Sequence, residues 1–297
     1  MADERTRVVL GTATPGGGFP LYGGAVAEAV NATDGSLAIE TRNTKGSTEN
    51  VPLLEAGDLD IALVQGEVAH EALAGVGRQP ANLKIVFAMY STAGMFVVRA
   101  DSPYRSIGDL RGKSVAFGAR GSGLVILARY VLDGIGLDQG KDFAAIYLDR
   151  AGDGPAMVLD GRAAALWGGG TGWPGFTAVA QGPAGARFVA PSADEAKRIL
   201  AKHAFLKPLA VPAGGYPGQT APIASVGSWS FILARPTFED DTAYRLARGL
   251  HRAAGTLAAR LDQARETTAA NTLSAAPRIE LIHSGVLRYL REIGLVR

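Results

Sequence analysis

The chain has 297 residues, of which 47% are apolar and 20% are charged. This composition excludes a wholly disordered chain, and the length predicts two domains because a domain commonly holds about 150 residues. The 30 lysines and arginines exceed the 28 aspartates and glutamates by only two, so a nucleic-acid binder with a broad basic face is not expected. Cysteine is absent, which excludes disulfides, zinc–thiolate sites, iron–sulfur clusters and cysteine nucleophiles.

The start of the chain does not read as a signal sequence. Residues 1–7 are charged, and the first apolar run, residues 8–10, is too short. We therefore expect either a cytosolic protein or the mature part of an exported precursor, with its signal upstream of Ala2. Two long uncharged stretches, residues 163–186 and 208–234, contain too many glycines and prolines for a continuous membrane helix.

Strands and helices alternate along most of the chain. In chain order, the pattern predicts strands at 7–10, 37–41, 60–64, 84–89, 95–99, 114–117, 143–148, 163–167, 187–190 and 224–233. Helices are predicted at 21–30, 47–57, 67–73, 124–132, 154–159, 242–258 and 281–293. Such alternation is typical of α/β proteins with parallel sheets, which bind ligands at the carboxyl ends of their strands.

Two similar blocks predict two lobes. Residues 1–97 with 228–297 form the first lobe, and residues 98–227 form the second. The strands at 95–99 and 226–233 are the expected hinge crossings, with a ligand cleft between the lobes that closes on binding.

Motifs of common enzymes are missing. His70 and Glu71 lack the second histidine of a zincin pair, and the four histidines do not have metal-ligand spacing. Arg120 stands where a G-x-S-x-G elbow needs glycine, and no Walker loop occurs. The formal dinucleotide motif at residues 170–175 contains Trp173 and Pro174, which would crowd a pyrophosphate. We expect no catalysis, metal or cofactor; a nucleotide-dependent enzyme is a remote alternative.

Three polar segments are candidates for a ligand site. Gly121-Ser122-Gly123 and Gly46-Ser47-Thr48 both open predicted helices, where free backbone N–H groups favour an anion. Ordinary N-capping is the alternative for each. Gln65 ends an apolar strand and is either a ligand donor or a satisfied loop amide. Arg120 either adds a salt bridge to the ligand or faces solvent.

Five aromatic residues lie near these loops: Phe19, Tyr22, Trp167, Trp173 and Tyr216. Each either packs in a core or lines the cleft. Trp167 is the most suggestive of a ligand contact, because it ends a strand immediately before three glycines.

Several motifs, in order along nearly the whole chain, resemble one family. They are Leu10-Gly11-Thr12, Gly16-Gly17-Gly18-Phe19-Pro20, Gly23-Gly24-Ala25, Gly46-Ser47-Thr48-Glu49-Asn50, the acidic strand 58–65 ending in Gln65, residues 98–102, 107–113 and 118–123, residues 212–219, and His283-Ser284-Gly285 with Arg288-Tyr289. Together they are similar to the TAXI family, the TRAP-associated extracytoplasmic solute-binding proteins.

The resemblance implies a type II periplasmic-binding-protein fold without catalytic activity. It implies a monomeric, periplasmic protein that delivers a small carboxylate, such as glutamate, a 2-oxoacid or a dicarboxylate, to a TRAP permease in the membrane. The expected ligand-binding residues are Thr14, Gly18, Phe19, Ser47, Gln65, Arg120, Gly121, Ser122, Gly123, Trp167, Gly168, Gly169 and Tyr216.

The sequence departs from the family at three of these places. Arg120 replaces a common proline, Phe19 a common tyrosine, and residues 167–170 a more apolar run. The identity of the ligand is therefore open. The alternatives are a neutral or aromatic solute stacked on Trp167, and a sensor that reports the bound solute to a signalling partner.

Overall fold

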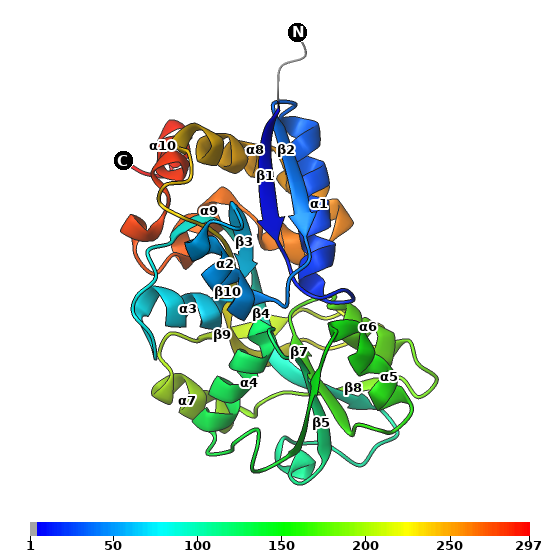
Figure 1. Cartoon of the computed structure of the whole chain (residues 1–297). Helices are drawn as coiled ribbons and strands as arrows, with labels where there is room; N and C mark the ends of the chain where they lie inside the picture. Colours follow the sequence, from blue (N-terminus) through cyan, green and yellow to red (C-terminus); the bar gives the residue numbers. More distant parts are fainter. Residues whose placement is uncertain (1–4) are drawn as a thin grey trace. The chain divides into compact units, whose positions relative to one another are not determined.

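The computed structural model describes residues 5–297 (Figure 1). Residues 1–4, which open the charged start of the chain, lie outside the described residues. The chain divides into two compact units. Unit 1 holds the described residues up to Ala13, Phe19–Tyr90 and Trp229–Arg297, and unit 2 holds Thr14–Gly18 and Ser91–Ser228.

The sheet of unit 1 is built on parallel strands. Strand β1 (Thr6–Gly11) lies between β2 (Leu37–Arg42) and β3 (Ile61–Val64) and is parallel to both. The last residues of β10 (Ile223–Ala234) pair antiparallel with β3. Because β1, β2 and β3 run in one direction, their carboxyl ends meet at one edge of the sheet.

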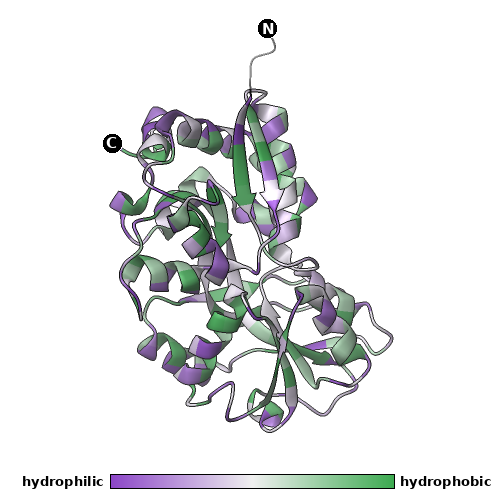
Figure 2. Cartoon of the chain, viewed as in Figure 1, coloured by the Kyte–Doolittle hydropathy of each residue, from purple (hydrophilic) through white to green (hydrophobic). Residues whose placement is uncertain are grey.

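Helices complete unit 1. They are α1 (Gly18–Thr33), α2 (Ser47–Ala56), α3 (Gly66–Ala74), α8 (Asp240–Arg260), α9 (Ala269–Ala275) and α10 (Ser284–Glu292), with 3₁₀ turns at Asp262–Glu266 and Ile279–Leu281. A shared core joins α1, α8 and α10 to the strands, with Leu10, Val30, Leu250 and Val286 at most 1% exposed. Figure 2 shows hydrophobic colouring along most of β1, as its position in this core requires.

Unit 2 contains the other strands. They are the second half of β4 (Lys84–Arg99), β5 (Ser114–Ala119), β6 (Ala144–Leu148), β7 (Ala165–Gly169), β8 (Ala186–Val189), β9 (Lys207–Val211) and the first half of β10. Strand β5 is parallel to β6 and β7, and β4 is antiparallel to β7 and β8.

The helices of unit 2 follow its strands. They are α4 (Gly123–Gly134), α5 (Gly154–Leu159), α6 (Pro174–Ala180) and α7 (Ala193–Lys202), with 3₁₀ turns at Gly108–Leu110 and Ala151–Asp153. Within residues 5–297, no helix combines the length and the apolar character that crossing a membrane requires.

Most predicted elements are confirmed, with shifts of a few residues at their ends. The two strands predicted at 84–89 and 95–99 are in fact one strand, β4. The strand continues through residues 91–94, where Gly94 serves packing. A Cβ on Gly94 would lie 2.8 Å from the Trp167 ring, so the missing side chain makes room for the indole without interrupting the strand.

The predicted elements do not include α6, α7, β9 and α9. Helix α7 carries a detectable start signal, because Ser192 and Glu195 form a capping box. In β9, Lys207–Val211, only Val211 is buried, so this strand has little of the apolar pattern on which the prediction relied.

Candidate functional site

In unit 1, two helices begin at the carboxyl edge of the parallel strands. Helix α2 starts at Ser47 after β2, and α3 starts at Gly66 after β3. The first N–H groups of a helix lack partners within it, and the helix dipole adds a partial positive charge there. This edge therefore favours electron-rich groups such as carboxylate or carbonyl oxygens.

Gln65 is held at this edge by its backbone. Its amide donates to Ser47 Oγ over 3.0 Å, and both residues are buried, at 4% and 1% exposure. The side-chain Nε2 of Gln65 is also buried but has no hydrogen-bond partner. An unpaired buried amide costs about 1–3 kcal/mol, so this donor is set up for an acceptor supplied from outside the fold.

Asn50 fixes the frame around Gln65. Its Nδ2 donates to the carbonyls of Thr12 and Leu63, each over 2.8 Å, and so joins α2 to the ends of β1 and β3. From the sequence, Asn50 was named only as part of the motif at residues 46–50, with no role of its own. Its position in the first turns of a helix after a glycine–serine start is the signal that could have identified this role.

Two aromatic residues of unit 1 have packing roles. Phe19 is partly buried against the core of unit 1. Tyr22 is fully buried, and its hydroxyl lies 2.9 Å from Thr267 Oγ1. Burial raises the pKa of Tyr22, which keeps the phenol neutral. Of the two predicted roles, core packing and a place in the cleft wall, Tyr22 therefore has the first.

In unit 2, the loop between β5 and α4 has the backbone features that the sequence indicated. The register of β5 against β6 shifts between Ala116 and Gly118, and Gly118 has φ of 119°. Glycine adopts this conformation without the steric cost that other residues meet. This irregularity lies at the end of β5, just before the loop that opens α4.

Ser122 is the N-cap of α4. Its Oγ accepts a hydrogen bond from Leu124 N over 3.1 Å, so the ordinary capping alternative holds for this residue. The hydroxyl proton of Ser122 is not used in that bond and can still be donated. Arg120 is exposed, and its guanidinium carbon lies 6.0 Å from the centre of the Tyr147 ring. That contact is a cation–π interaction and not a salt bridge.

The expectation that Trp167 stacks on a ligand does not fit the structure. Its side chain is 0% exposed in the core of unit 2, edge-to-face with Phe96 at 4.7 Å between ring centres. Its Nε1 already donates to the carbonyl of Leu124 over 2.8 Å. The indole is therefore part of the packing that supports the start of α4.

The glycines after Trp167 also serve packing. A Cβ on Gly168 would lie 2.5 Å from the Trp173 ring, and one on Gly169 would lie 2.3 Å from the carbonyl oxygen of Ala93. Both distances are far below van der Waals contact. Gly168 and Gly169 were expected to bind the ligand, but in the structure their missing side chains allow a close approach within the protein itself.

Tyr216 and Thr14 likewise have partners within unit 2. The Tyr216 hydroxyl donates to the carbonyl of Gly170 over 2.5 Å and accepts from Trp173 N over 3.1 Å. Burial raises its pKa. Thr14 Oγ1 accepts from Ala151 N over 3.1 Å, which holds residues 14–18 against the 3₁₀ turn at Ala151–Asp153. Both side chains therefore have structural roles in unit 2, and their contact with a ligand stays a prediction.

The structure thus reduces the expected set within each unit. Ser47 and Gln65 adjoin in unit 1, Arg120 to Gly123 form one loop in unit 2, and Gly18 is buried at the start of α1. Across residues 5–297, no three side chains of His, Cys, Asp or Glu are grouped as a metal ion would need.

Solved structures with similar folds define the class. The alkanesulfonate-binding protein SsuA from Xanthomonas axonopodis pv. citri, bound to MOPS, is 18% identical, with 98% of this chain and 85% of that chain covered and a TM-score of 0.55. A periplasmic transporter is 16% identical, with 98% and 93% covered and a TM-score of 0.58. The substrate-binding protein of an amino acid ABC transporter is 14% identical, with 86% and 98% covered and a TM-score of 0.51. The fold is α/β and that of the type II periplasmic binding proteins.

The sequence profile of the NMT1-like family matches residues 10–294. The chain belongs to the NMT1-like family.

Proposed function

We propose that this chain is an extracytoplasmic solute-binding protein for a small carboxylate, which it delivers to a TRAP-type membrane transporter. The observation that carries the proposal is Gln65: its side-chain Nε2 is buried, without a partner, beside the starts of α2 and α3. Such a donor next to two helix N-termini suits a carboxylate oxygen, since each feature favours negative charge.

Unit 2 supplies a second, separate argument for an anionic solute. The loop before α4 contains the free hydroxyl proton of Ser122 and the N-terminus of a helix of 12 residues. Arg120 adds a positive charge to the same loop, although its guanidinium lies over Tyr147. We therefore propose Ser47, Gln65 and residues 120–123 as the main ligand contacts. Gly18 and Phe19 are proposed as secondary contacts.

The TAXI resemblance supports delivery to a TRAP permease, a periplasmic location and a monomeric state, and each of these is a proposal. The solute-binding proteins among the similar folds favour binding over catalysis, so we propose no enzymatic activity. A sensor role would use the same pocket chemistry and differ only in the partner. Closure of the protein on its ligand stays a prediction, which solution scattering tests.

A panel of solutes tests the proposed ligand class. The purified protein is heated with carboxylates, amino acids, sulfonates and neutral solutes, and the unfolding temperature is compared. A ligand at 100 times its dissociation constant stabilises the folded state by about 2.7 kcal/mol. We expect stabilisation by a carboxylate and none by its amide analogue. Stabilisation by neutral solutes alone would contradict the proposal.

A further inference from the structure

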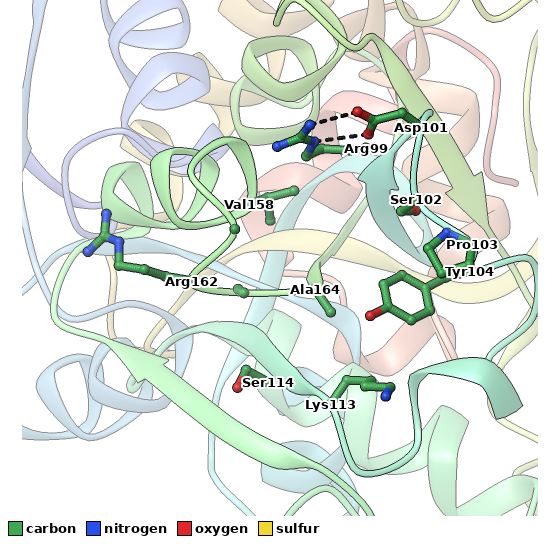
Figure 3. Close-up of a pocket in the computed structure, with 12 residues that line it drawn as sticks. Arg99, Asp101, Ser102, Pro103, Tyr104, Lys113, Ser114, Val158, Arg162 and Ala164 are labelled. Carbon is green, nitrogen blue, oxygen red and sulfur yellow. Dashed lines mark hydrogen bonds and ion pairs between the residues drawn. The ribbon is translucent and has the colours of Figure 1, made fainter.

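A pocket lies in unit 2, away from the loop that opens α4. It has a volume of about 480 Å³ and is formed by the end of β4, the loop after it, the start of β5 and the turn before β7 (Figure 3). Its polar lining residues are Arg99, Asp101, Ser102, Tyr104, Lys113, Ser114 and Arg162. This volume is in the range of sites for small molecules.

The pocket is separate from the proposed solute contacts. Ser114 begins β5, whereas Arg120 and Ser122 follow the other end of that strand. A strand rises about 3.3 Å per residue, so the six residues of β5 separate the two places by about 17 Å. One small ligand cannot occupy both.

Positive charge is concentrated around the loop of residues 100–104. Arg187 donates to the carbonyls of Ala100 and Ser102 over 2.7 and 3.0 Å, and Arg105 donates to that of Ser102 over 2.6 Å. Neither guanidinium forms an ion pair with a carboxylate within residues 5–297. The charge of Arg105 is offset in part by Asp109, whose carboxylate accepts from the backbone N–H groups of Arg105 and Ser106. Arg187 is therefore the cation held beside the loop without a carboxylate partner among the described residues.

Lys113 adds a further cation on the pocket wall. It has neither an ion pair nor a hydrogen bond from its ammonium group among the residues described. Arg99 and Asp101 neutralise each other through two hydrogen bonds, of 2.6 and 3.0 Å, drawn as dashed lines in Figure 3. Arg162 is paired with Asp160 and points away from the other lining side chains in Figure 3. Lys113 is thus the cation available to a bound molecule.

Hydroxyl groups supply the remaining donors. Ser102 Oγ is enclosed in the pocket wall without a hydrogen-bond partner, while both of its neighbouring arginines bond to its backbone carbonyl. To donate to a molecule in the pocket, this buried hydroxyl would have to rotate about χ1. In Figure 3 the Tyr104 hydroxyl is directed among the lining residues, on the side of Ala164. Unpaired cations with hydroxyl donors are the groups that bind oxyanions.

We propose that this pocket binds a small oxyanion, such as a phosphate or sulfate group of a metabolite, as a second ligand site of the protein. Lys113 provides the ion pair, Ser102 a hydrogen bond, and Arg187 a further positive charge beside the loop of residues 100–104. The site does not depend on the solute proposed above.

Calorimetry on the full chain at low ionic strength tests the site. The probes are inorganic phosphate, sulfate, and the pair glycerol 3-phosphate and glycerol. We expect saturable binding of the anions and none of glycerol. Lys113→Gln should weaken anion binding about tenfold, and Ser102→Ala about threefold. Lys207→Gln, an exposed lysine outside this pocket, is the matched control and should leave binding unchanged.

Two outcomes would overturn the proposal: no saturable anion binding by the wild type, or equal affinity in Lys113→Gln and the wild type. Thermal unfolding of each variant shows that it is folded. Gln65→Ala separates this site from the proposed solute site, because it should leave phosphate binding intact. If carboxylate binding fails while phosphate binding depends on Lys113, only the proposed function is rejected.

Discussion

The backbone amide of Gln65 donates to Ser47 Oγ over 3.0 Å, so the first residue of α2 fixes the start of α3. Replacing Ser47 with alanine would remove the acceptor and leave a buried N–H group without a partner. We expect Ser47→Ala to lower the free energy of unfolding by about 1–3 kcal/mol, measured by urea denaturation.

Ser274→Ala is the control for that variant, because the exposed Ser274 makes only a 3.4 Å bond within α9. It should change the free energy of unfolding by less than about 0.5 kcal/mol. Equal stability of Ser47→Ala and the wild type would show that the bond does not hold Gln65 in place.

Substitution of Trp167 should change the stability of the fold and not the affinity for the solute. Trp167→Phe removes the indole N–H and leaves the Leu124 carbonyl without that donor, within a fully buried core. We expect a loss of about 1–3 kcal/mol in the free energy of unfolding, with the solute affinity changed less than threefold. A large loss of affinity at unchanged stability would restore the stacking hypothesis.

Ser122 allows capping and ligand binding to be separated. Ser122→Ala removes the cap and should cost about 1 kcal/mol of stability. Ser122→Asp keeps an N-cap acceptor for Leu124 N but adds a negative charge. The aspartate variant should therefore be as stable as the wild type and bind a carboxylate at least tenfold more weakly in calorimetry. Unchanged carboxylate affinity in Ser122→Asp would remove this loop from the proposed site.

Buried His283 predicts loss of stability in mild acid. Burial lowers the pKa of His283, against the opposing effect of Asp240, and its Nδ1 accepts a hydrogen bond from Gly285 N over 3.3 Å, which needs the neutral ring. The unfolded chain takes up the proton near pH 6.5, whereas the folded chain does so only at lower pH. The stabilisation is therefore complete above about pH 6.5 and is lost as the pH falls below it.

Urea denaturation between pH 5 and pH 7.5 measures this slope. His283→Gln should have a smaller slope than the wild type. Burial also lowers the pKa of His70, so a residual slope should remain and be reduced in the double variant with His70→Gln. A slope identical in the wild type and His283→Gln would reject the assignment.

The sequence predicted elements and loops better than the roles of side chains. Helix α2 ends at Gly57, whose φ of 87° and bonds to the carbonyls of Leu53 and Leu54 follow from local chemistry that glycine signals. Trp167 was misjudged because its partner, the carbonyl of Leu124, lies 43 residues away. Long-range contacts of this kind leave no periodic signal in one sequence.

Gln65 is a second residue whose role depends on contacts that the sequence does not show. Its place at the end of a buried strand was readable, but the two interpretations, loop amide and ligand donor, could not be separated. The distinction needed the burial of Nε2 and its missing acceptor, which depend on how α2 and β3 pack.

Calorimetry with Gln65→Glu tests whether Gln65 binds the carboxylate of the solute. The substitution keeps the size of the side chain and replaces the unpaired Nε2 donor with a carboxylate oxygen. The wild type and the variant are each titrated with one carboxylate solute and with its amide analogue. The four affinities show whether binding depends on the Nε2 donor of Gln65 and on the negative charge of the solute. We expect the wild type to prefer the carboxylate at least tenfold and the variant to lose this binding while remaining folded. Equal carboxylate affinity in the wild type and Gln65→Glu would contradict this expectation.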